Sequence, residues 1–459
     1  MIGPRLRTPA IATTLLLLVA GAGAAGYAET HALRHHRSPA TSPLPTPPAA
    51  LALATAAPSS APVPSTAPAP DPTSVARALL RPLNASALGG DVIGEVLDVA
   101  DGTVLLDDDG SRTAAPASTA KLLTAAAALS VYPATHRFTT SVVAGSTPGT
   151  VVLVGGGDPT LTAAATGQPG AYPGAARLSS LAHQLRNEQV RRIVVDGSLF
   201  AGPSVAPQWA PEDVPSGYAS AITAVMVDGG RAAPGDAVRS ATPDLAAGRD
   251  LARLLGGPAI AVTRGTAPAG ARTLATVRSA SLDELVEQML QQSDNVIAEV
   301  LARHVAIAAG RPASFTGGAA AIRTTLARLG VSVGTGMVDG SGLAAGDRVS
   351  PAALTALLRL LAGPAHPRLH DVLAGLPVGA WSGTLADRYV AGSGSSAAAG
   401  AVRAKTGTLT GVSSLAGVVH DSSGRLLAFA FIADRAPSTA AADAALDRVV
   451  AALAGCGCA

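Results

Sequence analysis

The sequence predicts an α+β fold in which an antiparallel sheet with helices is interrupted by an inserted mixed or β-rich domain. Strand patterns occur near both ends of the folded part, and helix patterns lie between them. Short Val-rich runs separated by Gly, Pro and Asp turns fill residues 134–280, which marks the insertion. With 459 residues, the chain is also too long for one ordinary core, so two or more domains are expected.

The first expected elements are a hairpin and a helix. Residues 91–110 alternate apolar and polar side chains around Asp101-Gly102, which indicates two antiparallel strands joined by a tight turn. Pro116 precedes a long Ala- and Leu-rich run, which predicts a helix that opens near Ser118. We expect folding to begin near Ala76.

Helix patterns return after the insertion. Ser281 and Glu284 have capping-box spacing at the start of one helix, and a second helix ends at Gly310. Further helix patterns cover residues 319–329 and 351–361. Two apolar runs on either side of a turn at 421–424 then predict adjacent antiparallel strands, and a closing helix follows.

The N-terminal part has the composition of an export signal followed by a spacer. Arg5 and Arg7 precede an apolar, uncharged stretch at 9–28, as in secretory signals. Because this stretch is also near the length that spans a bilayer, residues 1–28 are either a signal peptide or a membrane anchor. Pro, Ala, Ser and Thr dominate residues 29–75, which predicts an unfolded, extended spacer. The folded body is accordingly expected outside the cytoplasm, secreted or anchored in the cell envelope.

Composition argues against several functions. The formal net charge is +2 without a dense Lys/Arg stripe, so nucleic-acid binding is not expected. No metal-binding spacing is present, and no cofactor is expected. Cys456 and Cys458 lie within the last four residues and do not form a disulfide scaffold, so surface thiols or an incidental tail are expected.

Three short motifs occur in order along the chain. They are Ser118-Thr119-Ala120-Lys121 (S-x-x-K), Ser293-Asp294-Asn295 (S-D-N) and Lys405-Thr406-Gly407 (K-T-G). Alone, each has an ordinary explanation: a surface helix start, a loop with Asx-turn chemistry or a β-turn. Together, at a helix opening, between two helices and on a strand, they form the trio typical of β-lactamases and penicillin-binding proteins.

Ser118 is the predicted nucleophile and Lys121 the predicted base. A serine hydroxyl needs a neighbouring base, and residues three apart on a helix share one face. Because a lysine at its ordinary pKa is protonated at neutral pH, we expect burial and a second cation, Lys405, to lower the pKa of Lys121. The Ser118 N–H at the positive end of the helix suits a developing oxyanion.

The remaining motif residues are expected to serve the substrate. Ser293 can relay a proton toward the leaving amine, and the Asn295 amide can hold the substrate backbone. The Lys405 ammonium offers a fixed positive charge for a free carboxylate, and the Thr408 N–H is a candidate second oxyanion donor. The predicted substrate-binding residues are thus Lys405, Thr406, Gly407 and Thr408.

Beyond the motifs, the chain resembles the D-alanyl-D-alanine carboxypeptidase/endopeptidase family of low-molecular-mass, class C penicillin-binding proteins. The similarity runs from about Ala76 to Leu453 and includes residues 153–162, 339–351 and 382–388. Members resemble one another in carrying extra domain material between the first two motifs, as this chain does. The chain departs from the family pattern at 218–230, and segment 339–342 is either a plain turn or part of the cleft.

The predicted organisation follows from the patterns and the resemblance together. Residues 76–133 and 281–455 are assigned to a penicillin-binding, serine β-lactamase-like transpeptidase domain, and residues 134–280 to the inserted domain. The resemblance implies a serine-type D-Ala-D-Ala carboxypeptidase and endopeptidase that acts on peptidoglycan stem peptides through an acyl-enzyme on Ser118. It also implies acylation of the same serine by β-lactams.

Two alternative functions stay open. A β-lactamase would turn over the penicilloyl adduct rapidly, whereas a peptidase would keep it. A non-catalytic, penicillin-binding wall sensor would be acylated stably but would release no D-alanine.

Overall fold

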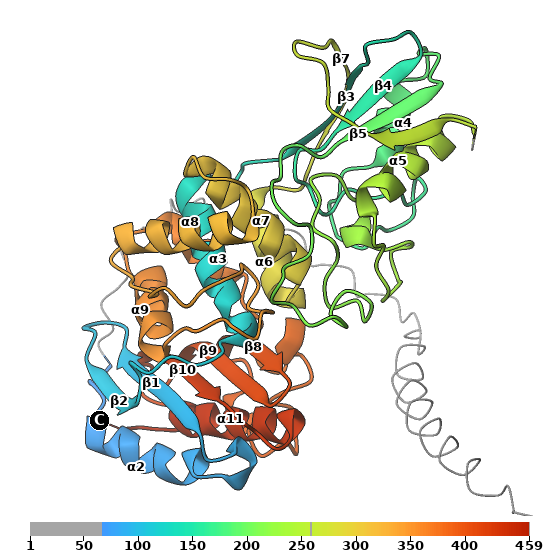
Figure 1. Ribbon diagram of the computed structural model, residues 1–459. Coiled ribbons are helices and arrows are strands. Elements are labelled where there is room, and N and C mark those ends of the chain that lie inside the picture. Colours follow the sequence, from blue (N-terminus) through green and yellow to red (C-terminus); the bar gives the residue numbers. More distant parts are fainter. Residues whose placement is uncertain (1–66, 258, 459) are drawn as a thin grey trace, which may run out of the picture. The chain divides into compact units, whose positions relative to one another are not determined.

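The computed structural model describes residues 67–257 and 259–458 (Figure 1). The predicted signal or anchor and the spacer up to residue 66 lie outside the described residues. None of the helices in the described ranges combines the length and apolar character needed to cross a bilayer. The longer helices are α2 (Pro72–Leu83), α3 (Lys121–Val131), α5 (Pro243–Leu254), α6 (Leu282–Gln292), α7 (Asn295–Ala308), α8 (Phe315–Arg328), α9 (Pro351–Ala362) and α11 (Thr439–Ala454). The shorter helices are α4 (Leu178–Gln184) and α10 (His370–Ala374).

The first sheet is antiparallel throughout and has the strand order β2-β1-β10-β9-β8. Its strands are β1 (Val92–Asp98), β2 (Val104–Asp108), β8 (Val402–Leu409), β9 (Val412–His420) and β10 (Leu426–Ala433). Leu415 and Phe429 face a core formed with α2 and α11, while Ala416 and Ala428 face a core formed with α3 and α9. The central strands are therefore buried on both faces, and the K-T-G motif lies on the edge strand β8.

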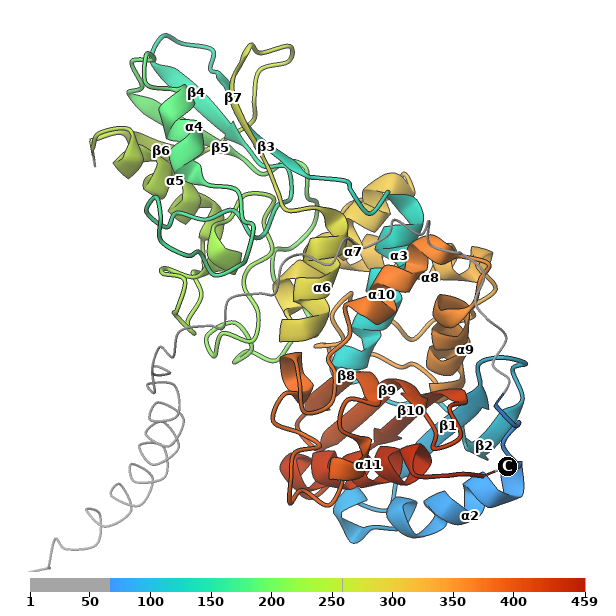
Figure 2. The same cartoon turned by 180° about the vertical axis from the view of Figure 1, so that it is seen from behind.

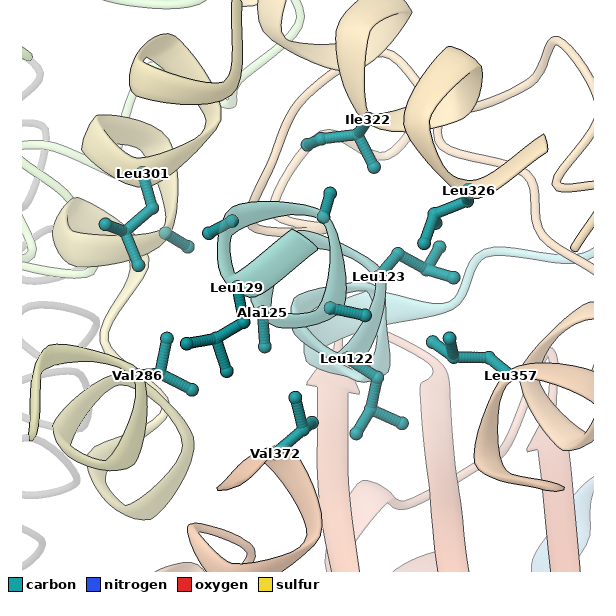
Figure 3. Close-up of a cluster of buried hydrophobic side chains, with 14 of the residues drawn as sticks. Leu122, Leu123, Ala125, Leu129, Val286, Leu301, Ile322, Leu326, Leu357 and Val372 are labelled. Atoms are coloured by element: carbon teal, nitrogen blue, oxygen red, sulfur yellow. The ribbon is translucent and has the colours of Figure 1, made fainter. Parts of the chain in front are cut away.

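The buried helix α3 carries the S-x-x-K lysine at its first residue. Every residue of α3 from Lys121 to Leu129 is buried, as expected for a helix that is apolar on all sides. Figure 3 shows its leucines packed among side chains from several other helices, including Leu301, Ile322 and Leu357. This packing fixes the end of α3 that points toward the first sheet.

A second, mixed sheet is formed entirely by strands within residues 134–280. Its order is β6-β5-β4-β3-β7, with parallel β4-β5 and β5-β6 pairs and antiparallel β3-β4 and β3-β7 pairs. Its strands are β3 (Thr139–Ala144), β4 (Thr150–Val154), β5 (Arg192–Asp196), β6 (Ala261–Arg264) and β7 (Thr273–Arg278). The chain enters on β3 and leaves on β7, and Thr139 is paired with Arg278. The predicted α+β architecture is confirmed, with one antiparallel and one mixed sheet (Figures 1 and 2).

Both ends of the described chain differ from the sequence prediction. Helix α2 begins four residues before the predicted start of folding, because Asp71 caps it by accepting the Ser74 N–H (2.8 Å) and Pro72 supplies its first residue. Cys456 and Cys458 are buried and joined as a disulfide, so the expectation of surface thiols is wrong. The carbonyl of Cys458 accepts the Asp71 N–H, which brings the C-terminal end against the start of α2.

Candidate active site

Lys121 lies at the junction of three segments that are distant in sequence. Its Nζ is 2.7 Å from Ser118 Oγ, 2.6 Å from Asn295 Oδ1 and 2.9 Å from the Ser341 carbonyl oxygen. Ser118 belongs to a 3₁₀ turn, Ala117–Ala120, that leads directly into α3. Because residues three apart eclipse one another in such a turn, the hydroxyl and the ammonium group share one face.

The hydrogen-bond partners of Lys121 fit the ammonium form, which donates to all three, and they also accommodate the neutral amine. The amide oxygen of Asn295 and the carbonyl of Ser341 can only accept, so two Lys121 N–H bonds point to them. In a neutral amine the remaining tetrahedral position is a lone pair, and it then faces the Ser118 hydroxyl, which can donate. The arrangement can therefore take the proton of Ser118.

Lys405 stands on the other wall of the same site. Its Nζ donates to Ser293 Oγ (2.9 Å) and to the Thr406 carbonyl (2.9 Å). The backbone of β8 also approaches the Ser118 turn, since a β-carbon on Gly407 would lie 2.9 Å from the Ser118 nitrogen. Only glycine permits this approach without displacing the turn.

Burial lowers the pKa of both lysines. The pKa of Lys121 falls to about 8 because burial outweighs the opposing effect of nearby carboxylates, of which Asp339 is the strongest. Burial, and then repulsion from Lys121 and Arg388, lowers the pKa of Lys405 well below its ordinary value. Burial lowers the pKa of Lys121, as predicted. The repulsion between the two cations, however, lowers the pKa of Lys405 and not that of Lys121. The charge of Lys405 is thus not fixed by its surroundings, and an incoming carboxylate would favour it.

The S-D-N motif joins two helices and turns its two outer side chains toward the lysines. Ser293 ends α6 with a left-handed φ of 55°, and Asp294 caps α7 by accepting the Val296 and Ile297 N–H groups (2.8 and 2.9 Å). Asn295, predicted in the connector, is the first residue of α7. Its amide nitrogen donates to the Tyr218 carbonyl (2.9 Å), which fixes its oxygen toward Lys121.

A cleft of about 1000 Å³ opens beside these groups. Ser118, Ser293, Asn295, Thr406 and Thr408 line it, so the structure brings residues of all three motifs to one cavity. The two lysine side chains and Gly407 are buried behind its wall. In the part of the chain that the structure describes, no group of three or more His, Cys, Asp or Glu side chains is arranged to hold a metal ion.

The sequence places this site in a known family. It matches the D-Ala-D-Ala carboxypeptidase 3 (S13) family over residues 75–235 and 233–454. The chain belongs to this family. A carboxypeptidase of Mycobacterium tuberculosis is 43% identical over 376 residues, which cover 80% of this chain and 81% of that protein. Carboxypeptidase DacB of Mycolicibacterium smegmatis is 42% identical over 399 residues, which cover 84% of this chain and 86% of that protein.

The S13 assignment confirms the predicted resemblance to class C penicillin-binding proteins. The crystal structure of penicillin binding protein 4 (dacB) from Haemophilus influenzae superposes with a TM-score of 0.68 at 23% identity. The match covers 80% of this chain and 98% of that one, which shows that the two share a fold.

Several residues of this S13 site carry contacts that the sequence analysis did not assign. The carbonyls of Ser341 and Tyr218 orient Lys121 and Asn295, and the Thr384 hydroxyl lies 2.8 Å from that of Thr406. Tyr218, Ser341 and Thr384 belong to segments 218–230, 339–351 and 382–388, which the family resemblance includes or marks as a departure. The roles of Tyr218 and Ser341 could not be predicted, because every residue type has a backbone carbonyl. Segment 339–342, for which a turn and a cleft position were both open, does line the site: Gly342 faces the cleft.

Proposed function

We propose that this protein is an extracytoplasmic serine-type D-Ala-D-Ala carboxypeptidase and endopeptidase that acts on peptidoglycan stem peptides, with Ser118 as its nucleophile. The observation that carries the proposal is the contact between Ser118 Oγ and the buried Lys121 Nζ (2.7 Å), whose pKa lies near 8. An amine with that pKa is partly neutral at physiological pH and can act as a general base.

In the proposed acylation, Ser118 Oγ attacks the carbonyl carbon of the penultimate D-alanine while its proton moves to Lys121 Nζ. The N–H groups of Ser118 and Thr408 stabilise the oxyanion of the tetrahedral intermediate. The C–N bond then breaks, and the proton that Lys121 took from Ser118 passes by way of the Ser293 hydroxyl to the amine nitrogen of the departing D-alanine, which leaves Lys121 neutral again. Ser293 is suited to this step because its hydroxyl accepts from Lys405 and faces the cleft.

In the proposed deacylation, water attacks the ester on Ser118 and restores the free hydroxyl. Before acylation, while the substrate is still intact, the carboxylate of its terminal D-alanine is expected near Thr406 and Thr408, where it raises the pKa of Lys405 and restores its charge. A β-lactam places its own carboxylate and strained amide in the same positions. Penicillin binding protein 4 (dacB) of H. influenzae, whose fold this chain shares, has been solved in complex with a β-lactam, which supports β-lactam binding by this protein.

A fluorescent penicillin tests the nucleophile directly. The wild-type protein should be labelled stably, and Ser118→Ala should not be labelled at all. The matched control is Ser130→Ala, at the other end of α3, where the hydroxyl donates to the Ala126 carbonyl (2.6 Å). Labelling that persists in Ser118→Ala would refute the assignment.

Product analysis separates the proposed peptidase from its two alternatives. Release of D-alanine from a pentapeptide, together with a long-lived penicilloyl adduct, supports the carboxypeptidase. Rapid loss of the adduct would support a β-lactamase, and a stable adduct without D-alanine release would support a wall sensor. Conversion of cross-linked dimers to monomers would add the endopeptidase activity.

The proposed domain division and location extend this function. We assign residues 76–133 and 281–455 to the peptidase domain and 134–280 to the inserted segment, with residues 1–28 as the export signal or membrane anchor. Action outside the cytoplasm agrees with the substrate class of the family. A protease-protection assay on intact cells tests the location.

A further inference from the structure

The inserted segment (residues 134–280) contacts the middle residue of the S-D-N motif. Asp294 is buried, and its two carboxylate oxygens have separate tasks. One oxygen caps helix α7 through the Val296 and Ile297 N–H groups. The other accepts the hydroxyl hydrogen of Tyr172, which belongs to the inserted segment (2.8 Å).

Two arginines of the inserted segment complete the surroundings of Asp294. Arg239 Nη2 lies 3.7 Å and Arg231 Nη2 lies 4.0 Å from the same carboxylate oxygen that Tyr172 contacts. Arg231 also donates to the Tyr172 hydroxyl (2.9 Å). A buried carboxylate requires such partners, because an unpaired charge away from water is strongly unfavourable.

Arg239 links Asp294 to the loop that orients Asn295. Its Nε donates to the Gly217 carbonyl (3.1 Å) and its Nη1 to the Gly229 carbonyl (2.7 Å). The neighbour of Gly217 is Tyr218, whose carbonyl accepts from Asn295 Nδ2. One guanidinium group thereby contacts both the residue before Asn295 and the residue before the acceptor of the Asn295 amide.

We propose that Tyr172, Arg231 and Arg239 are positioning residues of the active site, through which the inserted segment sets the orientation of Ser293 and Asn295. These residues touch neither Lys121 nor the cleft, and they act through Asp294 and the Tyr218 loop. The inference rests on the proposed function, since it assigns Ser293 and Asn295 to the reaction. It gives the inserted segment a part in catalysis that does not depend on any ligand of its own.

A purely structural role makes a different prediction from a positioning role. If the contacts only hold the inserted segment in place, their loss lowers the melting temperature and the fraction of protein that titrates with penicillin. The fraction that still titrates would then react at the wild-type rate. A positioning role instead lowers the acylation rate constant of the titrating fraction and leaves the noncovalent binding constant nearly unchanged.

The first test removes one hydroxyl with Tyr172→Phe. Acylation by a fluorescent penicillin over a range of concentrations separates the acylation rate constant from the binding constant. We expect the rate constant to fall about tenfold, the size expected for one hydrogen bond to a buried charged group. The control is Tyr132→Phe, which removes a hydroxyl that donates to the His304 carbonyl (3.2 Å), and it should react at the wild-type rate.

The second test removes and then restores the cation with Arg239→Met and Arg239→Lys. The methionine variant should lose more acylation rate than Tyr172→Phe, and the lysine variant should recover part of that loss. The control is Arg425→Met, which removes another buried arginine from its ion pair with Asp98 (2.6 Å), away from the S-D-N motif. It should be less stable but should acylate at the wild-type rate.

The outcomes separate this inference from the proposed function. Wild-type protein without penicillin labelling would overturn the proposed function, and the inference with it. Labelled wild type together with unchanged rate constants in Tyr172→Phe and Arg239→Met would overturn the inference alone. If Arg239→Met does not fold, Tyr172→Phe decides the question.

Discussion

The two walls of the cleft each bury one lysine, but in opposite electrostatic surroundings. Lys121, on the helical wall, lies near the carboxylates of Asp339 and Asp294, which raise its pKa against the effect of burial. Lys405, on the strand wall, is influenced by two cations, Lys121 and Arg388, which lower its pKa further. Both side chains are fully buried, so burial alone does not distinguish them.

This difference shows how one residue type can serve two purposes in one site. The carboxylates keep the pKa of Lys121 close to neutral pH, where an amine can accept a proton and return it. Lys405 has no such support, so its charge depends on an anion that enters the cleft. The comparison predicts a base on the helical wall and a carboxylate-responsive group on the strand wall.

The largest expected effect comes from removing the base. Lys121→Met should lower the rate of acylation by a fluorescent penicillin by about 1000-fold, within the usual range for general-base catalysis. Lys121→Arg should be nearly as inactive, because a guanidinium keeps the charge but cannot lose its proton. An active arginine variant would show that Lys121 acts only as a cation. The proposed difference between a base on the helical wall and a carboxylate-responsive lysine on the strand wall would then be wrong.

The second effect comes from removing the other lysine. Lys405→Met should weaken acylation by a β-lactam about 100-fold, mainly through weaker noncovalent binding, because the substrate carboxylate loses its partner. A β-lactam with an esterified carboxylate should react similarly with both proteins. If the loss is equal for acid and ester, Lys405 does not respond to the carboxylate.

The third effect is a pH dependence that belongs to the helical wall. Because Lys121 must be neutral to accept the proton and its pKa is about 8, the acylation rate should fall about tenfold per pH unit below pH 8. Stopped-flow acylation between pH 5.5 and about 9 measures the profile. A rate that is flat from pH 6 to about 8 would contradict the assignment of Lys121 as the base.

The smallest effect concerns a carboxylate behind Lys121. Burial, with a further contribution from Asp339, raises the pKa of Glu299 to about 8, from an ordinary value of 4.5. At a pH between these two values, Glu299 keeps a proton in the folded protein that it has released in the unfolded chain. The free energy of unfolding of the protein therefore falls as pH rises through this range. The loss is at most about 1.4 kcal/mol per pH unit.

Glu299→Gln should remove this dependence. Urea unfolding measures the free energy of unfolding of both proteins. The value for the variant minus the value for wild type should increase as pH rises from 4.5 to 8. Glu284→Gln is a control without pH dependence in this window. Hydrogen bonds from Ser281 lower the pKa of Glu284, so its stabilisation is complete above its ordinary value of 4.5 and is lost only as pH falls below it. A difference between Glu299→Gln and wild type that does not vary with pH would show that Glu299 is ionised in the folded protein.

Local features of the fold could be predicted because they depend on neighbouring residues. The capping box at the start of α6 forms as its spacing indicates, with the Ser281 N–H donating to Glu284 (2.7 Å). The turn at Asp101-Gly102 joins β1 and β2, and Gly102 has the positive φ that such turns favour (81°). The start of α9 at Pro351 is likewise local.

Other features could not be predicted because they depend on contacts between distant segments. The burial of Cys456 and Cys458 follows from packing against α2 and the first sheet, which the composition of the C-terminal end does not reveal. The link between Asp294 and Tyr172 joins residues 122 positions apart. No periodicity in either segment predicts it.

By itself, the sequence determined the α+β class, the order of the three motifs and the pairing of Ser118 with Lys121 on one turn, since i and i+3 positions share a face wherever that turn forms. Only the tertiary structure decided that Lys121 is fully buried, that its partners are Asn295 and the Ser341 carbonyl, and that Lys405 meets Ser293. A pKa depends on burial and on the charges that packing brings near the group. Packing joins segments that are far apart in the sequence, and their sequence separation does not predict their distance in space.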